Sequence, residues 1–115
     1  MDNIKIKFRG KIIRIKVKKA EGLSNIIGLM FKRKNTNNLL FTFRKSTNIS
    51  FHSFFVFFPF YIIWLNRKNE VLSLKKVYPF NPIVKCEKGR FYKVLEAPAN
   101  KNNERILSII SKNRR

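Results

Sequence analysis

The sequence of 115 residues contains one cysteine, one histidine and six acidic residues. The single cysteine, Cys86, allows no internal disulfide, and small secreted domains usually carry several, so we expect an intracellular, cytoplasmic protein. A structural zinc site takes about four nitrogen or sulfur ligands. One imidazole and one thiol cannot provide them, and the sequence therefore predicts neither a bound metal nor a cofactor.

The residues that usually carry acid–base or nucleophilic chemistry are scattered. The acids are Asp2, Glu21, Glu70, Glu87, Glu96 and Glu104, and they follow no recognised catalytic or metal-ligand spacing. Cys86 lies in a polar segment where Lys85 and Lys88 should lower the pKa of its thiol, but no catalytic base lies near it in the sequence. These observations favour a protein that is not an enzyme, with an enzyme of undetermined type as the alternative.

Charge is absent from one long stretch, between Ser46 and Asn66. Its length nearly suffices for a membrane span, which needs roughly 20 apolar residues. The first third of the stretch is polar, however, and Pro59 lies in its middle, where it would break a lone transmembrane helix. We instead expect two buried strands, Phe51 to Phe58 and Phe60 to Leu65, on either side of that proline.

The N-terminal segment alternates apolar and basic residues, which is the pattern of half-buried strands. The apolar positions are Ile4, Ile6, Phe8, Ile13, Ile15 and Val17, and the basic ones are Lys5, Lys7, Arg9, Arg14, Lys16 and Lys18. The apolar set changes parity after Gly10, which predicts a turn or a bulge near Arg9 and Gly10. The regular interruption by charge also distinguishes this segment from the apolar core of a signal peptide.

Further strands are predicted at Asn38 to Phe43, Glu70 to Val77 and Phe91 to Glu96, with the loop Asn66 to Asn69 forming a hairpin. Residues 100–115 should form a basic helix or tail, which Asn102 or Asn103 could cap. The length suits one core. We therefore predict a single domain over residues 1–115: a mostly β, compact sandwich or barrel of about seven strands with a short C-terminal helix.

Four segments, in order along the chain, resemble the signature blocks of one family. They are GLMFKR at residues 28–33, LLFTF at 39–43, HSFFVFFPFYIIWL at 52–65 and YKVLEAPA at 92–99. The pattern is similar to that of domain of unknown function 192, especially its archaeal branch. The resemblance implies a compact, mostly β fold like a jelly roll and a family with no established biochemical activity.

The chain also departs from that family pattern. Tyr61 stands where the family usually has an aspartate after the central proline, and Asn66 replaces the next characteristic acid. Any shared chemistry that used these acids would be lost here. Asn100 replaces a glycine, and asparagine tolerates a positive φ moderately well.

The resemblance marks a candidate ligand pocket, formed by Gly28, Leu29, Met30, Phe31, His52 and Phe55. His52 could act there as a hydrogen-bonding or acid–base group at the mouth of an aromatic pocket. The alternative is structural: a glycine turn followed by core residues, with a histidine that satisfies a backbone carbonyl at a strand end. The structural interpretation is favoured because a lone base without an orienting partner is a poor catalyst.

Positive charge dominates the rest of the chain, with 26 lysines and arginines and a formal net charge of +20. Such a charge destabilises a compact fold unless counter-ions or an anionic partner are present. The basic residues of the N-terminal strands, about 6.8 Å apart at alternate positions, form a ladder suited to a phosphate backbone. We therefore predict binding of nucleic acid, in the first place RNA. The alternatives are a small ligand near Met30 and His52, an anionic membrane surface, and a solvated face without a partner.

Overall fold

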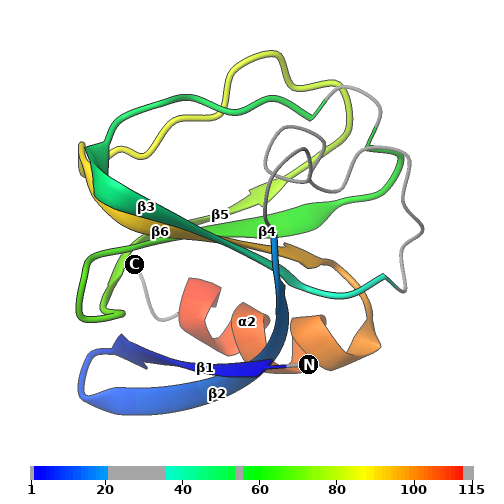
Figure 1. The fold of residues 1–115 in the computed structure, drawn as a ribbon. Helices are drawn as coiled ribbons and strands as arrows, with labels where there is room; N and C mark the ends of the chain where they lie inside the picture. The colour runs from blue at the N-terminus through cyan, green and yellow to red at the C-terminus, as the bar shows by residue number, and fades with distance from the viewer. Residues whose placement is uncertain (1, 21–35, 54–55, 113–115) are drawn as a thin grey trace.

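The computed structural model of the chain describes residues 2–20, 36–53 and 56–112, drawn in Figure 1. Its elements are β1 (Asp2–Phe8), β2 (Lys11–Lys19), β3 (Leu39–Thr47), β4 (Phe60–Leu65), β5 (Val71–Val77), β6 (Phe91–Pro98) and α2 (Lys101–Lys112). The six strands form one sheet in the order β1-β2-β3-β6-β4-β5. This confirms the predicted C-terminal helix and the two predicted N-terminal strands. It also confirms the strands predicted around residues 39–43, 60–65, 70–77 and 91–96.

The sheet curls into a half-barrel around α2. Figure 1 shows the helix between the β1–β2 hairpin on one side and the strands β3, β6, β4 and β5 on the other. The two edge strands approach each other where the Lys7 N–H donates to the Asn69 carbonyl at 2.9 Å, beside a bridge between Lys7 and Glu70. We predicted a sandwich or a barrel, and the observed sheet is a half-barrel: it is not closed, because this contact does not extend into a ladder within the described residues. The likeness to a jelly roll stays a prediction.

The first hairpin turns through Arg9 and Gly10, whose φ angles are 49° and 80°. Two positive φ angles in a two-residue loop are typical of the tight hairpin turn whose twist matches that of the strands. Across such a loop, an even-numbered residue of the first strand lies opposite an odd-numbered residue of the second, as Ile4 lies opposite Ile15. The predicted turn is confirmed, and it explains why the apolar set changes parity.

Strand β4 is the centre of the core, and all six of its residues are buried. Its Ile63 belongs to the cluster that packs against Leu107 of α2, whereas Trp64 belongs to a second cluster on the opposite face of the sheet. There the Trp64 ring meets the ring of Phe91, with centroids 6.4 Å apart. The prediction that Phe60 to Leu65 is covered on both sides is confirmed.

The predicted strand from Phe51 to Phe58 is wrong. Phe51 forms an isolated bridge with Val84, and residues 56–58 lie outside any strand. Val56 and Phe58 are buried against the second cluster, while the side chain of Phe57 is 59% exposed. Val56 and Phe58 therefore cover the sheet from a loop: their side chains pack on its face although their backbone joins no ladder. The strand count is six in the described ranges, against about seven predicted.

Helix α2 begins after Asn100 and not, as predicted, after Asn102 or Asn103. The side-chain oxygen of Asn100 accepts a hydrogen bond from the Asn103 N–H at 3.1 Å, which is the bond an N-cap residue makes. Leu107 and Ile110 of this helix are buried in the core cluster that it shares with the sheet. Within the described ranges, no helix is long and apolar enough to span a bilayer.

Candidate nucleic-acid interface

The solvent side of the β1–β2 hairpin carries a row of cations that we call the basic face. It consists of Lys5, Lys7, Arg14, Lys16 and Lys18, and all five side chains are exposed. They alternate with residues that point into the core, so the strand period places them on the same side of the hairpin. The structure therefore brings together five of the six basic residues that the sequence singled out.

The sixth, Arg9, lies in the turn at the end of this hairpin. Its guanidinium carbon is 5.2 Å from the centre of the Phe8 ring, a distance at which cation and ring attract each other. Arg9 is exposed. It thus extends the positive charge of the hairpin without belonging to the row on the strands.

The composition and the strand register of the basic face place like charges near one another. Lys5 lies directly opposite Arg14 in the antiparallel pair, and like charges at such positions destabilise a sheet. Residues 2–19 hold eight lysines and arginines but one acid, Asp2. An anion bound across the two strands would relieve this repulsion.

Two ion pairs among the described residues involve β5, and both lie away from the basic face. Lys75 pairs with Glu87 at 3.3 Å, and Lys76 pairs with Glu104 of α2 at 2.8 Å. Both lysines belong to β5, at the other end of the strand order from the hairpin. Two of the six acids are thus engaged with β5.

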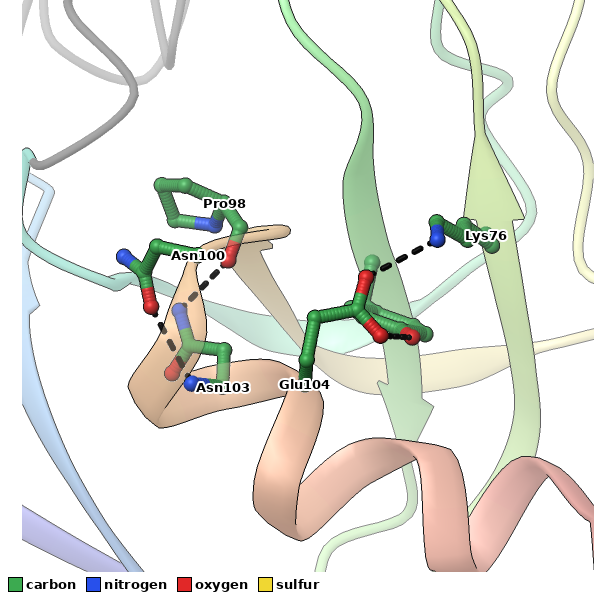
Figure 2. Close-up of polar contacts among 6 residues, drawn as sticks. Lys76, Pro98, Asn100, Asn103 and Glu104 are labelled. Carbon is green, nitrogen blue, oxygen red and sulfur yellow. Dashed lines mark hydrogen bonds and ion pairs between the residues drawn. The ribbon is translucent and has the colours of Figure 1, made fainter.

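Glu104 lies beside Tyr61, the residue at which the resemblance implied an acid. Figure 2 shows its carboxylate between Lys76 and a tyrosine ring; that tyrosine is Tyr61, whose hydroxyl donates to Glu104 Oε2 at 2.7 Å. A carboxylate is therefore present beside Tyr61, although it comes from the helix. Sequence reasoning missed this pair because its members lie 43 residues apart.

This network changes the protonation of its members. Burial, and next the hydrogen bond to Glu104, raise the pKa of Tyr61 far above its usual value. The hydrogen bond to Glu104 raises the pKa of Lys76. The phenol is thus held neutral and the amine charged, which fits an anchor between α2 and the sheet better than a proton-transfer site.

A second polar cluster ties α2 to the end of β2. Asn103 Nδ2 donates to the Pro98 carbonyl at 2.6 Å, drawn in Figure 2, and to Asn38 Oδ1 at 2.8 Å. Asn38 Nδ2 in turn donates to the Lys16 carbonyl at 3.0 Å. These amides hold the helix at a fixed place beside β2 and line a groove of about 900 Å³ between the two. The role of these residues could not be foreseen, since asparagines in a polar segment are common in loops.

The pocket that the sequence predicts cannot be assembled from the described residues. Gly28, Leu29, Met30, Phe31 and Phe55 lie outside them. His52 is exposed between the bridge at Phe51 and the buried Ser53. The pocket near Met30 and His52 therefore stays a prediction.

The neighbouring Ser53 has a structural role that the sequence did not reveal. Its hydroxyl donates to the Tyr78 carbonyl at 2.8 Å and accepts the Asn81 N–H at 2.6 Å. Its side chain is fully buried. Ser53 thus fixes the irregular connection after β5 against the loop that follows β3.

Cys86 differs from its prediction in the direction of its pKa. Burial raises the pKa of the thiol, and this outweighs the backbone N–H of Lys88 and the charge of Lys75, which lower it. A protonated, half-buried thiol is a poor nucleophile. In the part of the chain that the structure describes, no group of three or more His, Cys, Asp or Glu side chains could hold a metal ion.

Comparison with known proteins yields a family and a fold. The profile of the family DUF192, described as "Uncharacterized ACR", matches residues 4–109. None of the curated proteins matches the sequence. A crystal structure of a protein of unknown function from Novosphingobium aromaticivorans superposes with a TM-score of 0.73 at 16% identity, covering 90% of this chain and 76% of that one.

A second crystal structure has the same fold. It is that of a protein from Sinorhizobium meliloti, provisionally described as a transcription regulator, and it superposes with a TM-score of 0.72 at 17% identity. The match covers 90% of this chain and 82% of that one. At such identities the likeness shows the arrangement of the elements and nothing about activity.

Proposed function

The chain belongs to the DUF192 family, and we propose that it binds RNA, without catalysis, through the basic face of its β1–β2 hairpin. The observation that carries the proposal is the alignment of Lys5, Lys7, Arg14, Lys16 and Lys18 on one exposed side of two strands. Basic side chains that neutralise phosphates release counter-ions, which is the main source of affinity in binding without sequence preference.

The surroundings of the basic face support a polyanion as the partner. The hairpin holds one acid against eight basic residues, so positive charge dominates its surface. Lys5 and Arg14, opposite each other, would share a phosphate or contact successive ones. RNA is the polyanion that a cytoplasmic protein meets most often, and cytoplasmic location is what the single cysteine favours. The provisional description of the Sinorhizobium protein as a transcription regulator is compatible with a nucleic-acid partner.

The proposal is tested by the salt dependence of binding to a fluorescein-labelled oligouridylate, followed by anisotropy. We expect weak base preference and an affinity that falls steeply with salt, with a slope of about 0.7 in the log–log plot for each neutralised phosphate. Replacement of Lys5, Lys7, Lys16 and Lys18 by glutamine should lower this slope by roughly 3 if each lysine meets one phosphate.

A matched control separates the basic face from general charge. Lys45, Lys68, Lys85 and Lys88 are exposed at other places on the molecule, and their replacement by glutamine removes the same net charge. This variant should keep most of the salt slope. Equal slopes for both quadruple variants would refute a localised interface, and an unchanged slope in the first would refute the proposal. Binding to anionic vesicles but not to RNA would assign the face to a membrane surface instead.

A further inference from the structure

Strand β2 has an open edge along most of its length. One edge pairs with β1, while the other pairs with β3, within the described ranges, at Lys18 and Lys19 alone. The N–H and C=O of one strand residue point to the same edge, and successive residues alternate. Since Lys18 donates its N–H to the Asn38 carbonyl at this second edge, the backbone groups of Ile12 and Arg14 point the same way.

At Arg14 and Lys16 the open edge borders the groove of about 900 Å³ between β2 and α2, and Ile12 continues this edge just outside the groove. Ligand sites of proteins commonly measure about 300 to 1,000 Å³. The opposite wall is α2, which the bonds from Asn103 to Asn38 and Pro98 keep in place. A sheet edge and a fixed helix thus border a space whose volume lies in the range of ligand sites.

Among the described residues, the charged side chains that line this groove are all positive. Lys11, Arg14, Lys16 and Arg105 contribute to its walls, and no aspartate or glutamate of residues 2–20, 36–53 or 56–112 does. Lysines on an edge strand commonly prevent pairing with a second copy of the same edge, because like charges meet. The same charges attract an edge of opposite sign. They therefore exclude this chain as its own partner and favour an acidic one.

We propose that the groove takes an extended acidic peptide that adds a strand to the open edge of β2. The backbone of the peptide would bond to Ile12 and Arg14, which is how peptides join exposed sheet edges in several domain families. Ile12 to Lys16 spans four residue rises, or about 14 Å, so about five peptide residues would pair. This partner is distinct from RNA, although Arg14 and Lys16 belong to both surfaces.

The two sides of the added strand would meet different surroundings. On the solvent side, alternate peptide residues would lie beside Arg14 and Lys16, which suits glutamate or aspartate. On the inner side, they would meet the half-buried Ile13 and Ile106, which suits valine or isoleucine. The partner is therefore a segment in which acidic and branched aliphatic residues alternate.

The test uses a fluorescein-labelled heptapeptide of alternating glutamate and valine with the full chain. Ile12 is 65% exposed, and its N–H points to the open edge, so Ile12→Pro removes a donor to the peptide and no bond to β1. We expect Ile12→Pro to weaken binding about tenfold, the effect of one hydrogen bond. Ile12→Ala keeps the donor and should bind within about threefold of the original chain. Thermal unfolding checks that both variants fold.

A second measurement distinguishes backbone pairing from attraction of charge alone. In amide hydrogen exchange, the N–H groups of Ile12 and Arg14 should exchange more slowly when the peptide is bound. The same peptide, N-methylated at alternate residues, keeps its charges but loses donors on one edge, and it should bind far more weakly. The proposal would be overturned if the methylated peptide bound as tightly as the unmethylated one, or if the peptide left hydrogen exchange at Ile12 and Arg14 unchanged. Both results can be obtained whether or not Ile12→Pro folds. The proposal would also be overturned if oligouridylate, and not the peptide, slowed hydrogen exchange at the amides of Ile12 and Arg14. RNA binding by Ile12→Pro should be normal, so this proposal and the RNA proposal can fail separately.

Discussion

Tyr61→Phe removes one hydroxyl from the contact between the sheet and α2. The Tyr61 side chain is 2% exposed and donates to Glu104 Oε2 at 2.7 Å. A hydrogen bond to a charged acceptor contributes about 1.5 to 3 kcal/mol. Glu104 keeps its ion pair with Lys76 and is 35% exposed, so water can replace the lost donor. We therefore expect a loss near the lower limit, about 1.5 kcal/mol at pH 7.

The same substitution should matter less as the pH rises. Burial raises the pKa of Tyr61 above its usual 10.0 in the folded chain. Above pH 10 the unfolded chain releases the phenolic proton and the folded chain keeps it, so the stability of the original protein falls by about 1.4 kcal/mol per pH unit. The Tyr61→Phe variant lacks this group. Its deficit of about 1.5 kcal/mol should therefore nearly vanish at pH 11.

Urea unfolding at pH 7, 9, 10 and 11 measures this difference, with the fluorescence of the buried Trp64 as the signal. The raised pKa of Lys76 also lowers stability above its usual 10.5, but this lysine is present in both proteins and largely cancels. A deficit that stays constant from pH 7 to pH 11 would show that the Tyr61 phenol ionises as easily in the folded chain as in the unfolded one. The buried network in Figure 2 would then be wrong.

Two further substitutions test the core and the start of the helix. Phe91→Ala should cost about 3 to 5 kcal/mol in urea unfolding, because the ring is 1% exposed and packs against the Trp64 ring; the exposed Phe57→Ala should cost below about 0.5 kcal/mol, and similar losses for both would contradict the assignment of the core. Asn100→Ala should cost about 1 kcal/mol through the lost N-cap, measured as the fall in midpoint denaturant concentration. Asn100→Asp should restore that stability and the exposed Asn102→Ala should leave it unchanged; equal effects of Asn100→Ala and Asn102→Ala would place the cap elsewhere.

Local patterns predicted the elements whose side-chain burial can be read from the order of neighbouring residues. Alternation at Ile4 to Val17 identified the hairpin and the exposed basic face, because each strand residue points to the side opposite its neighbours. The uncharged run identified Phe60 to Leu65 as a strand buried on both faces. The family followed from four short blocks, and the profile match over residues 4–109 confirms it. Local sequence patterns thus identified all five residues of the basic face before the structure was known.

The errors arose where the same local pattern suits two structures. An apolar run such as Phe51 to Phe58 can form a strand or can cover one as a loop, since periodicity reports burial and not backbone pairing. The cap at Asn100 instead of Asn102 depends on where the chain leaves β6. The predicted pKa of Cys86 was wrong in direction because burial, which no neighbouring residue reveals, outweighed the nearby charges.

The sequence by itself determined which residues are buried in the hairpin and in β4, where the positive charge is concentrated, and which family the chain resembles. Tertiary structure alone decided that one sheet curls around α2, that Glu104 comes to Tyr61 from 43 residues away, and that β2 keeps an open edge beside the helix. The physical reason is the range of the interactions. Alternation and turns act over a few residues, whereas strand order, ion pairs across elements and grooves depend on how the whole chain closes its core.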